Sequence, residues 1–264
     1  MKRRQFIRSM AAGAATAITL KSSEAEMQEK PSAQPQEFYE LRKYTLRNGG
    51  GPKLTENFFA QAMIPALNRL GVSPVGAFKV DIGPETPTYY LLLPSTSAET
   101  LLTVDQRLAK DAEFLKAAAG FWDAPAATPA FIRVESSIFS AFTGWPKLTA
   151  PKPGKRIFQL RTYESPGYAA HLKKIEMFNN GEIEIFVRSG LAPVFFGSAL
   201  TGPLLPNLTY MLTFPDLPTL SANWSKFGSD PAWKELSHRP GNTDPEIVSN
   251  ITNLYLSPLA CSQI

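Results

Sequence analysis

Two segments far apart in the chain alternate between aromatic or apolar residues and polar ones, at residues 38–44 and 157–163. An alternation with a period of two predicts β-strands, because successive side chains of a strand point to opposite faces. After the first of these strands, apolar residues recur at helical spacing over residues 55–70. This spacing predicts a helix that is kinked at Pro65 and ended by Gly71.

Further apolar runs complete a small unit after each of these strands. They predict second strands at residues 75–80 and 194–198, matched third strands at 89–93 and 210–214, and fourth strands at 139–142 and 254–256. Residues 96–99, Thr-Ser-Ala-Glu, have the pattern of a capping box and predict the start of a second helix. The predicted order is β-α-β-β-α-β, which is that of a ferredoxin-like unit.

The two units are copies of one another. Three blocks repeat at an offset of 119 residues: Leu41, Arg42 and Tyr44 with Leu160, Arg161 and Tyr163; Gly71, Pro74 and Val75 with Gly190, Pro193 and Val194; and Asp111 and Phe114 with Asp230 and Trp233. A common offset indicates a tandem duplication. Because a ferredoxin-like unit leaves one sheet face bare, two linked copies can bury their bare faces together. We therefore predict an α+β fold in which two tandem ferredoxin-like units pack sheet to sheet as a pseudo-dimeric α+β barrel.

The first residues of the chain predict export from the cytoplasm. Arg3 and Arg4 are followed by Phe6, and residues 11–20 form a short, weakly apolar run. This is the pattern of a twin-arginine signal peptide, with cleavage expected after Ala25. The apolar run is too short to span a bilayer, so we expect no stable membrane span. The expected location is the periplasm or the cell exterior.

Composition divides the rest of the chain into two domains. After the signal peptide at residues 1–25, the polar residues 26–36 predict a disordered tether, and three prolines within residues 145–154 predict an extended linker. The domains are expected at residues 37–144 and 155–264. Without residues 1–25 the chain has equal numbers of basic and acidic residues. We therefore expect no nucleic-acid partner.

The most distinctive residues lie in the second unit. They are Met-Phe-Asn-Asn-Gly-Glu at 177–182, Gly-Leu-Ala-Pro-Val-Phe-Phe at 190–196, Asn-Leu-Thr-Tyr-Met-Leu at 207–212, Trp224, Phe227, and Asp-Pro-Ala-Trp at 230–233. On these residues the chain resembles the NIPSNAP family, which belongs to the broad group of dimeric α+β barrels. The resemblance covers about residues 37–259 and implies the fold, but no settled activity accompanies this family. The first unit departs from the pattern, with Asp-Ala-Glu-Phe at 111–114.

The conspicuous residues of the family pattern are interpreted as structural. They are Pro193, Trp224, Asp230 and Trp233. Asp230 before Pro231 predicts a helix N-cap with proline at the first helical position. Trp224 and Phe227 lie three residues apart on a predicted helix, which favours packing in the core.

The usual catalytic and metal-binding motifs do not occur in this sequence. The two histidines, His171 and His238, are interpreted as surface residues rather than ligands of a metal or a haem iron. Cys261 is the only cysteine, so no disulfide can form within the chain. We therefore predict no metal and no cofactor, and leave open whether the protein is an enzyme.

Six side chains share one face of the two first strands: Glu40, Arg42 and Tyr44 on one strand, and Gln159, Arg161 and Tyr163 on the other. If the two units enclose that face, two guanidiniums and two phenols converge in a partly apolar cavity. Such a cavity would suit a small ligand with a carboxylate or an enolate. The alternative is that each arginine pairs with a nearby acid and only satisfies its strand.

Three functions are compatible with these features. The first is an exported protein of uncharacterised activity that binds a small molecule in the α+β barrel. The second is a cofactor-independent oxygenase or isomerase acting on an enolisable substrate, since related barrels include cofactor-free monooxygenases and haem-binding enzymes. The third is a non-enzymatic protein-interaction module. A homo-oligomer is compatible with all three.

Replacing both Arg3 and Arg4 by Lys should leave the precursor in the cytoplasm. The export receptor recognises the paired guanidiniums, and an ammonium group does not replace them. Cell fractionation followed by immunoblotting measures the effect. Normal processing of the double variant would refute the twin-arginine assignment.

Overall fold

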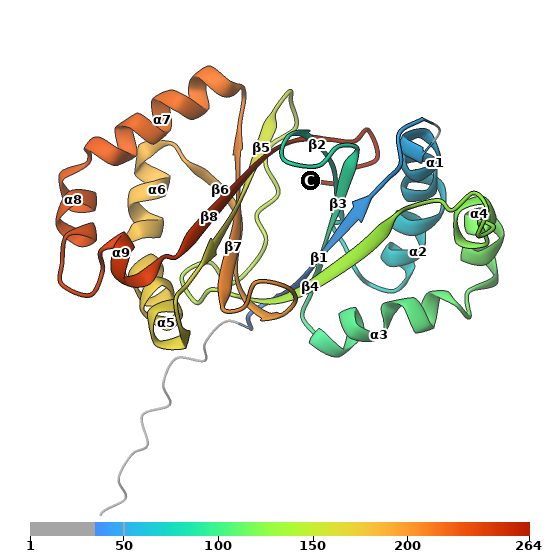
Figure 1. Ribbon diagram of the computed structural model, residues 1–264, viewed down its shortest axis with the longest axis horizontal. Coiled ribbons are helices and arrows are strands. Elements are labelled where there is room, and N and C mark those ends of the chain that lie inside the picture. Colours follow the sequence, from blue (N-terminus) through green and yellow to red (C-terminus); the bar gives the residue numbers. More distant parts are fainter. Residues whose placement is uncertain (1–34, 50) are drawn as a thin grey trace, which may run out of the picture. The chain divides into compact units, whose positions relative to one another are not determined.

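The computed structural model describes residues 35–49 and 51–264, which belong to one compact unit. The predicted signal peptide and residues 26–34 of the predicted tether lie outside the described residues. Strands cross the middle of the unit, with the helices of the first half on one side and those of the second half on the other (Figure 1).

Both halves contain the predicted order of elements. The first half forms β1 (Phe38–Thr45), α1 (Gly51–Phe58), the π-helical turn η1 (Phe59–Met63), α2 (Ile64–Arg69), β2 (Gly76–Ile82), β3 (Thr88–Ser95), α3 (Ala98–Leu108), α4 (Ala112–Trp122) and β4 (Arg133–Ala141). The second half forms β5 (Ile157–Glu164), α5 (Tyr168–Met177), η2 (Phe178–Glu182), α6 (Ile183–Ser189), β6 (Ala192–Thr201), β7 (Asn207–Phe214), α7 (Leu217–Ser229), α8 (Pro231–Ser237), α9 (Asp244–Ile247) and β8 (Asn250–Pro258). Gly71 has a φ of +81° just after α2, as expected for the residue that ends a helix.

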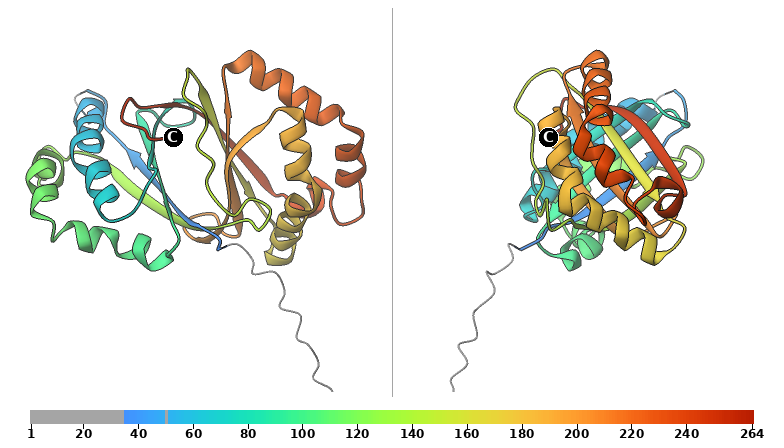
Figure 2. Two further views of the ribbon diagram at one scale, coloured as in Figure 1. Left: turned by 180° about the vertical axis from the view of Figure 1, so that it is seen from behind. Right: turned by 90° about the vertical axis from the view of Figure 1, so that its left-hand side faces the viewer.

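The eight strands close into one barrel in the order β1-β3-β2-β8-β5-β7-β6-β4. Two antiparallel pairings, β2 with β8 and β4 with β6, join the halves. Each strand therefore has one face toward the barrel interior and the other toward the helices of its own half, which lie on the outside of the barrel (Figure 2). The predicted pseudo-dimeric α+β barrel is confirmed.

Apolar side chains form three clusters that match this layering. One fills the barrel interior, and the other two lie between the strands and helices of each half. β3 and β7 contribute to both kinds of cluster, so nearly all their residues are buried. This explains why these strands appear in the sequence as continuous apolar runs.

The pairing register fixes which residues of the two halves correspond. Arg42 lies opposite Leu91 on β3, and Arg161 lies opposite Tyr210 on β7. The offset of 119 residues therefore holds through the third strands, and the predicted matching of residues 89–93 with 210–214 was wrong by two residues. A continuous apolar run carries no alternation that could fix its register.

The two ends of the barrel differ. Leu148 of the linker and the C-terminal Ile264 pack into the interior cluster at the end where β2 and β6 begin. The opposite end, where β3 and β7 begin, contains the pocket described below.

Candidate functional site

The polar face of the first strand in each half lies under helices and not inside the barrel. Tyr44 packs in the helix-side cluster of the first half and Tyr163 in that of the second, while the alternate residues of both strands fill the interior. Arg42 and Arg161 share the outward face with these tyrosines, so the predicted shared cavity is wrong. Alternation grouped the side chains correctly, but both faces are buried and alternation cannot distinguish them.

In the first half, Arg42 is paired with carboxylates. Its Nε and Nη2 donate to the two oxygens of Glu40 at 2.7 and 3.1 Å, and its Nη1 donates to Asp105 of α3 at 2.7 Å. The hydroxyl of Ser136 on β4 also donates to Glu40, at 2.7 Å. The alternative prediction, in which the arginine pairs with nearby acids, is confirmed for this half.

In the second half, Arg161 has different neighbours. Its Nη2 donates to the Tyr163 hydroxyl at 2.9 Å, and that oxygen also accepts from Tyr210 at 3.0 Å. The Trp224 ring lies 4.5 Å from the guanidinium carbon, and its Nε1 donates to Gln159 at 2.7 Å. Within residues 35–49 and 51–264, no carboxylate lies within 4.0 Å of the Arg161 nitrogens. The pairing with a local acid is therefore absent from this half.

A buried ion pair lies beside Arg161. Lys174 Nζ on α5 is 3.1 Å from Glu182 Oε2 at the end of η2, and both side chains are only 1% exposed. The ring centroids of Tyr163, Phe178 and Trp233 lie between 5.1 and 5.5 Å from Nζ. Burial raises the pKa of Glu182, and the nearby Lys174 ammonium opposes that rise. One carboxylate and three aromatic rings thus hold this ammonium away from water.

A helix kink brings the pair together. Glu182 follows Lys174 by eight residues, whereas partners within a regular helix are three or four residues apart. Gly181 has a φ of +151°, and a Cβ at this position would lie 3.3 Å from Leu236. The π-helical segment η2 therefore depends on glycine at position 181. The first half has the π-helical turn η1 at the corresponding position, and such turns are frequent at functional sites.

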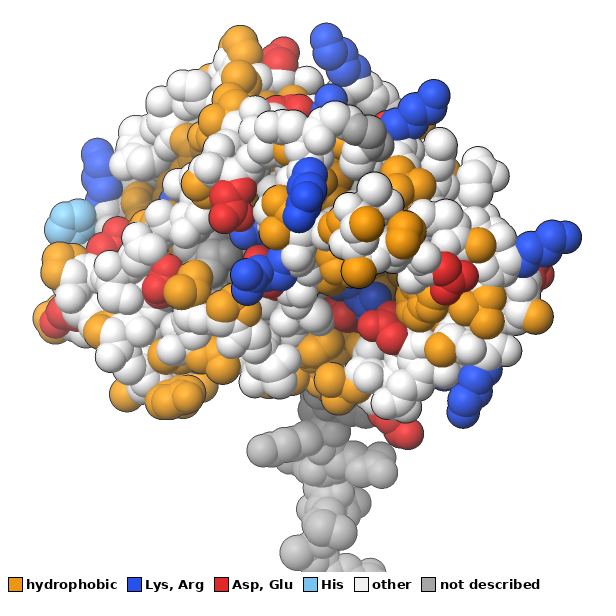
Figure 3. All heavy atoms as spheres, turned by 45° about the vertical axis from the view of Figure 1, so that its right-hand side comes forward, with side chains coloured by type: hydrophobic (Ala, Val, Ile, Leu, Met, Phe, Trp, Pro, Cys, Tyr) orange, Lys and Arg blue, Asp and Glu red, His pale blue; other side chains and the backbone are white. Residues whose placement is uncertain are grey.

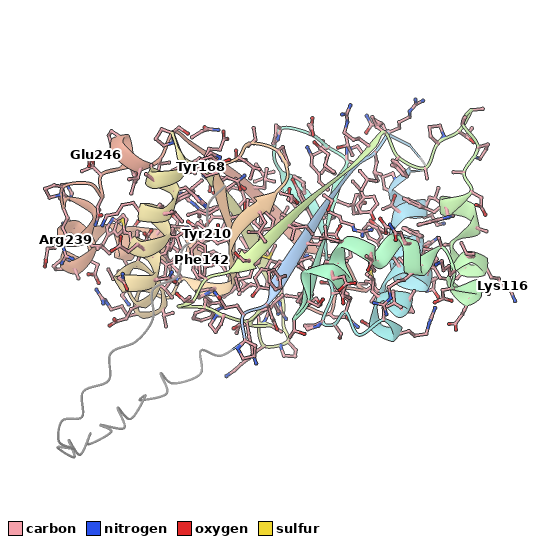
Figure 4. All side chains as sticks on the ribbon, turned by 90° about the horizontal axis from the view of Figure 1, so that it is seen from below. Lys116, Phe142, Tyr168, Tyr210, Arg239 and Glu246 are labelled. Carbon is pink, nitrogen blue, oxygen red and sulfur yellow. The ribbon has the colours of Figure 1, made fainter. Side chains whose placement is uncertain are left out.

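The cluster around Lys174 occurs in one half only. By the offset of 119 residues, Lys174, Glu182, Tyr210, Gln159 and Trp224 correspond to Thr55, Met63, Leu91, Glu40 and Asp105. The arginine and the tyrosine of the first strand are common to both halves, and so is Phe178, which corresponds to Phe59. Figure 4 shows Tyr210 and Phe142, which both pack in the helix-side cluster of the second half, on the other side of the barrel from Lys116 of the first half.

Lys174, Glu182 and Tyr210 were not predicted to be site residues. One signal was available, because Lys174 lies three residues after His171 and three before Met177, which is the spacing of a single helix face. A second signal was the phenol of Tyr210 at the position that the aliphatic Leu91 has in the first half.

The histidines behave differently from one another. His238 is exposed, as predicted. His171 is only 5% exposed, because α5 turns this face toward the sheet. Its Nε2 lies 2.9 Å from the Ser198 hydroxyl of β6, and burial lowers the pKa of its imidazole. The prediction of a surface residue was therefore wrong for His171.

The Asp-Pro-Ala-Trp element has the predicted structural role. Asp230 caps α8 by accepting from the backbone N–H groups of Ala232 and Trp233 at 2.8 and 3.3 Å. Arg188 donates two hydrogen bonds to the same carboxylate, which is the main reason that the pKa of Asp230 falls to about 2. Pro193 lies at an irregularity in the pairing of β6 with β7.

A pocket of about 360 Å³ occupies the open end of the barrel. Its apolar wall contains Leu41, Val80, Tyr90, Phe139, Leu160 and Leu254, and its polar groups include Thr88, Ser137, Thr162, Asn207 and Thr209. Several of these are corresponding residues of the two halves, such as Leu41 with Leu160 and Tyr90 with Thr209. The pocket therefore lies where the halves meet.

The charged groups at the mouth of the pocket are paired. Lys43 Nζ lies 2.6 Å from Glu85 and 3.4 Å from Glu135. Deeper in the pocket, burial is the main reason that the pKa of Tyr90 rises to about 12. Elsewhere on the surface, acidic and basic side chains are interspersed on the face shown in Figure 3.

Two kinds of feature are missing from residues 35–49 and 51–264. No group of three or more His, Cys, Asp or Glu residues is arranged to hold a metal ion. None of the helices has both the length and the apolar character needed to cross a membrane.

The NIPSNAP family model matches residues 39–127 and 158–263, with one match in each half. A search of curated proteins finds no match.

Similar solved structures come from several bacteria. A candidate monooxygenase from Lactobacillus acidophilus NCFM is 10% identical, with a TM-score of 0.56, and the alignment covers 84% of this chain and 94% of that chain. A candidate monooxygenase from Fusobacterium nucleatum is also 10% identical, with a TM-score of 0.56 and coverage of 86% and 94%. A NIPSNAP-like domain protein from Burkholderia xenovorans is 19% identical, with a TM-score of 0.35 and coverage of 40% and 86%. At these identities the first two structures establish the shared fold alone.

Replacing Lys174 by Met should lower the free energy of unfolding by about 3 kcal/mol at neutral pH, because it leaves the Glu182 carboxylate buried without its partner. The loss should be larger at pH 8 than at pH 5. Burial already raises the folded-state pKa of Glu182 above its unfolded value, and removing the ammonium raises it further. The variant therefore loses stability as the pH rises from the unfolded-state pKa of Glu182 toward its higher folded-state pKa.

Urea unfolding at both pH values measures this effect. The matched control is Lys173→Met, because Lys173 is partly exposed and pairs with Glu176 at the surface. It should change stability by less than about 0.5 kcal/mol. If Lys174→Met loses the same free energy of unfolding at both pH values, the variant does not leave the Glu182 carboxylate buried without a partner.

Proposed function

This chain belongs to the NIPSNAP family, and we propose that it binds a small, largely apolar molecule in the pocket at the open end of its barrel. The observation that carries the proposal is the pocket volume of about 360 Å³, which falls within the range of roughly 300–1,000 Å³ typical of small-molecule sites. Polar side chains in the same wall, among them Ser137, Thr162 and Asn207, can orient a ligand by hydrogen bonds.

The lining indicates an uncharged ligand. Half of the lining residues are apolar or aromatic, and the polar ones away from the mouth are hydroxyls and an amide, which are uncharged. At the mouth, Lys43 is paired with Glu85 and Glu135. A neutral molecule with one or two hydrogen-bonding groups therefore fits better than an anion. We further propose that binding takes place outside the cytoplasm, on the basis of the predicted signal at residues 1–25.

The enzymatic alternative receives less support from this pocket. An oxygenase or isomerase acting on an enolisable substrate needs a base within reach of the substrate. Among the described lining residues, Glu85 and Glu135 are at the mouth beside Lys43, and burial is the main reason that the pKa of Tyr90 reaches about 12. The interaction module is disfavoured because it would not require an open cavity.

Filling the pocket should weaken binding. The probe is 2-naphthol, a fluorescent, apolar molecule with one hydroxyl. It should bind the wild-type protein saturably at one site, and Thr162→Phe, which places a ring inside the pocket, should weaken binding about tenfold or more. Fluorescence titration measures the affinity.

The matched control is Thr128→Phe, which adds the same side chain at an exposed position in the loop before β4. It should bind 2-naphthol like the wild type. The proposal fails if wild-type protein shows no saturable binding or if Thr162→Phe binds as tightly as the control.

A further inference from the structure

The helix–sheet interface of the second half contains more positive than negative charge. Arg161 and Lys174 lie close to a single carboxylate, that of Glu182, and Lys174 forms the ion pair with it. Buried and half-buried charges in proteins are normally paired. Arg161 is therefore a cation whose charge no carboxylate of the described residues balances.

Some N–H groups of the Arg161 guanidinium also donate no hydrogen bond to the described residues. Nη2 donates to Tyr163, whereas Nε is buried without any hydrogen-bond partner among the described residues. Gln159 does not serve it, since its oxygen accepts from Trp224 and its amide nitrogen donates to Asn253. Nη1 also has no hydrogen-bond partner among the described residues and, unlike Nε, is accessible, so the guanidinium can still bind a carboxylate.

The first half shows which partner suits this position. Arg42 is the counterpart of Arg161 and binds two carboxylates, those of Glu40 and Asp105. The second half has Gln159 and Trp224 at the corresponding positions. Both internal carboxylates have thus been replaced by uncharged side chains, while the arginine is unchanged.

We propose that Arg161 binds the carboxylate of a small organic ligand, which supplies from outside the negative charge that Glu40 and Asp105 supply to Arg42. The site lies at the surface between β5, β8 and α7. It is separate from the barrel pocket and does not rest on the function proposed for that pocket.

The surroundings of Arg161 suit a planar carboxylate. Arg161, Trp224 and Tyr255 are each partly exposed, and Asn253 on β8 is exposed, so solutes can approach from this side. The Trp224 ring stacks against the guanidinium at 4.5 Å and holds its plane fixed. Carboxylates bind arginine in that plane, and the neighbouring rings offer an apolar surface to the rest of the ligand.

Benzoate is the probe, and the side-chain Nε–H signals of isotopically labelled protein are the readout. The Arg161 signal is assigned by its loss in Arg161→Lys. Benzoate should shift this signal saturably and leave the Arg42 signal unchanged, because Arg42 is already paired. Thr162→Phe, which fills the barrel pocket, should not alter the response.

The decisive variant is Gln159→Glu, which restores the carboxylate that Glu40 supplies to Arg42. It should weaken benzoate binding about tenfold or more, because the internal carboxylate occupies the arginine. A carboxylate can still accept from Trp224, so the fold should be kept. Gln159→Met is the matched neutral control and should retain binding. If Gln159→Glu does not fold, Trp224→Asp restores the other carboxylate and should have the same effect.

Three results would overturn the proposal. One is that benzoate does not shift the Arg161 signal in the wild type, and another is that it binds equally well when an internal carboxylate is restored. The third is a loss of the response in Thr162→Phe, which would place benzoate in the barrel. Sulfate is the comparison anion, and tighter binding of sulfate than of benzoate would contradict the assignment to carboxylates.

Discussion

Closure of the sheet through the pairings of β2 with β8 and β4 with β6 is the constraint on which the rest of the structure depends. A closed barrel has no free strand edges. A polar side chain on a buried stretch of strand must therefore find a partner under the helices or line the open end of the barrel. The Arg42 ion pairs and the polar lining of the pocket are these two outcomes.

The two halves of the duplicated chain surround the arginine of their first strand with different side chains. Both place an arginine and a tyrosine from the first strand under the helices. The first half neutralises its arginine with Glu40 and Asp105, whereas the second surrounds Arg161 with Tyr163 and Trp224 and buries an ion pair nearby. The fold requires only that each interface be packed, so one copy was free to acquire chemistry that the other lacks.

Features governed by local rules could be predicted from the sequence. The tandem duplication, the β-α-β-β-α-β order, the helix end at Gly71 and the N-cap at Asp230 all depend on short-range spacing and backbone conformation. The barrel followed from the need to cover two bare sheet faces.

Features set by tertiary packing could not be predicted in this way. The outward direction of Arg42 and Arg161 was missed because both faces of their strands are buried and alternation is then uninformative. The burial of His171 and Lys174 was missed because a single polar residue on a helix is usually exposed. Only the position of α5 against the sheet shows that their face of the helix points inward.

Closure of the barrel is tested most directly by a disulfide across one of the two pairings between the halves. Lys79 and Ser257 lie directly opposite one another on β2 and β8, so cysteines at both positions in a Cys261→Ser background are close enough to be bridged. Mild oxidation should link them almost completely, whereas cysteines at Lys79 and Asn250 should stay reduced. Failure of the first pair to form, or equal formation of both, would contradict the closed barrel.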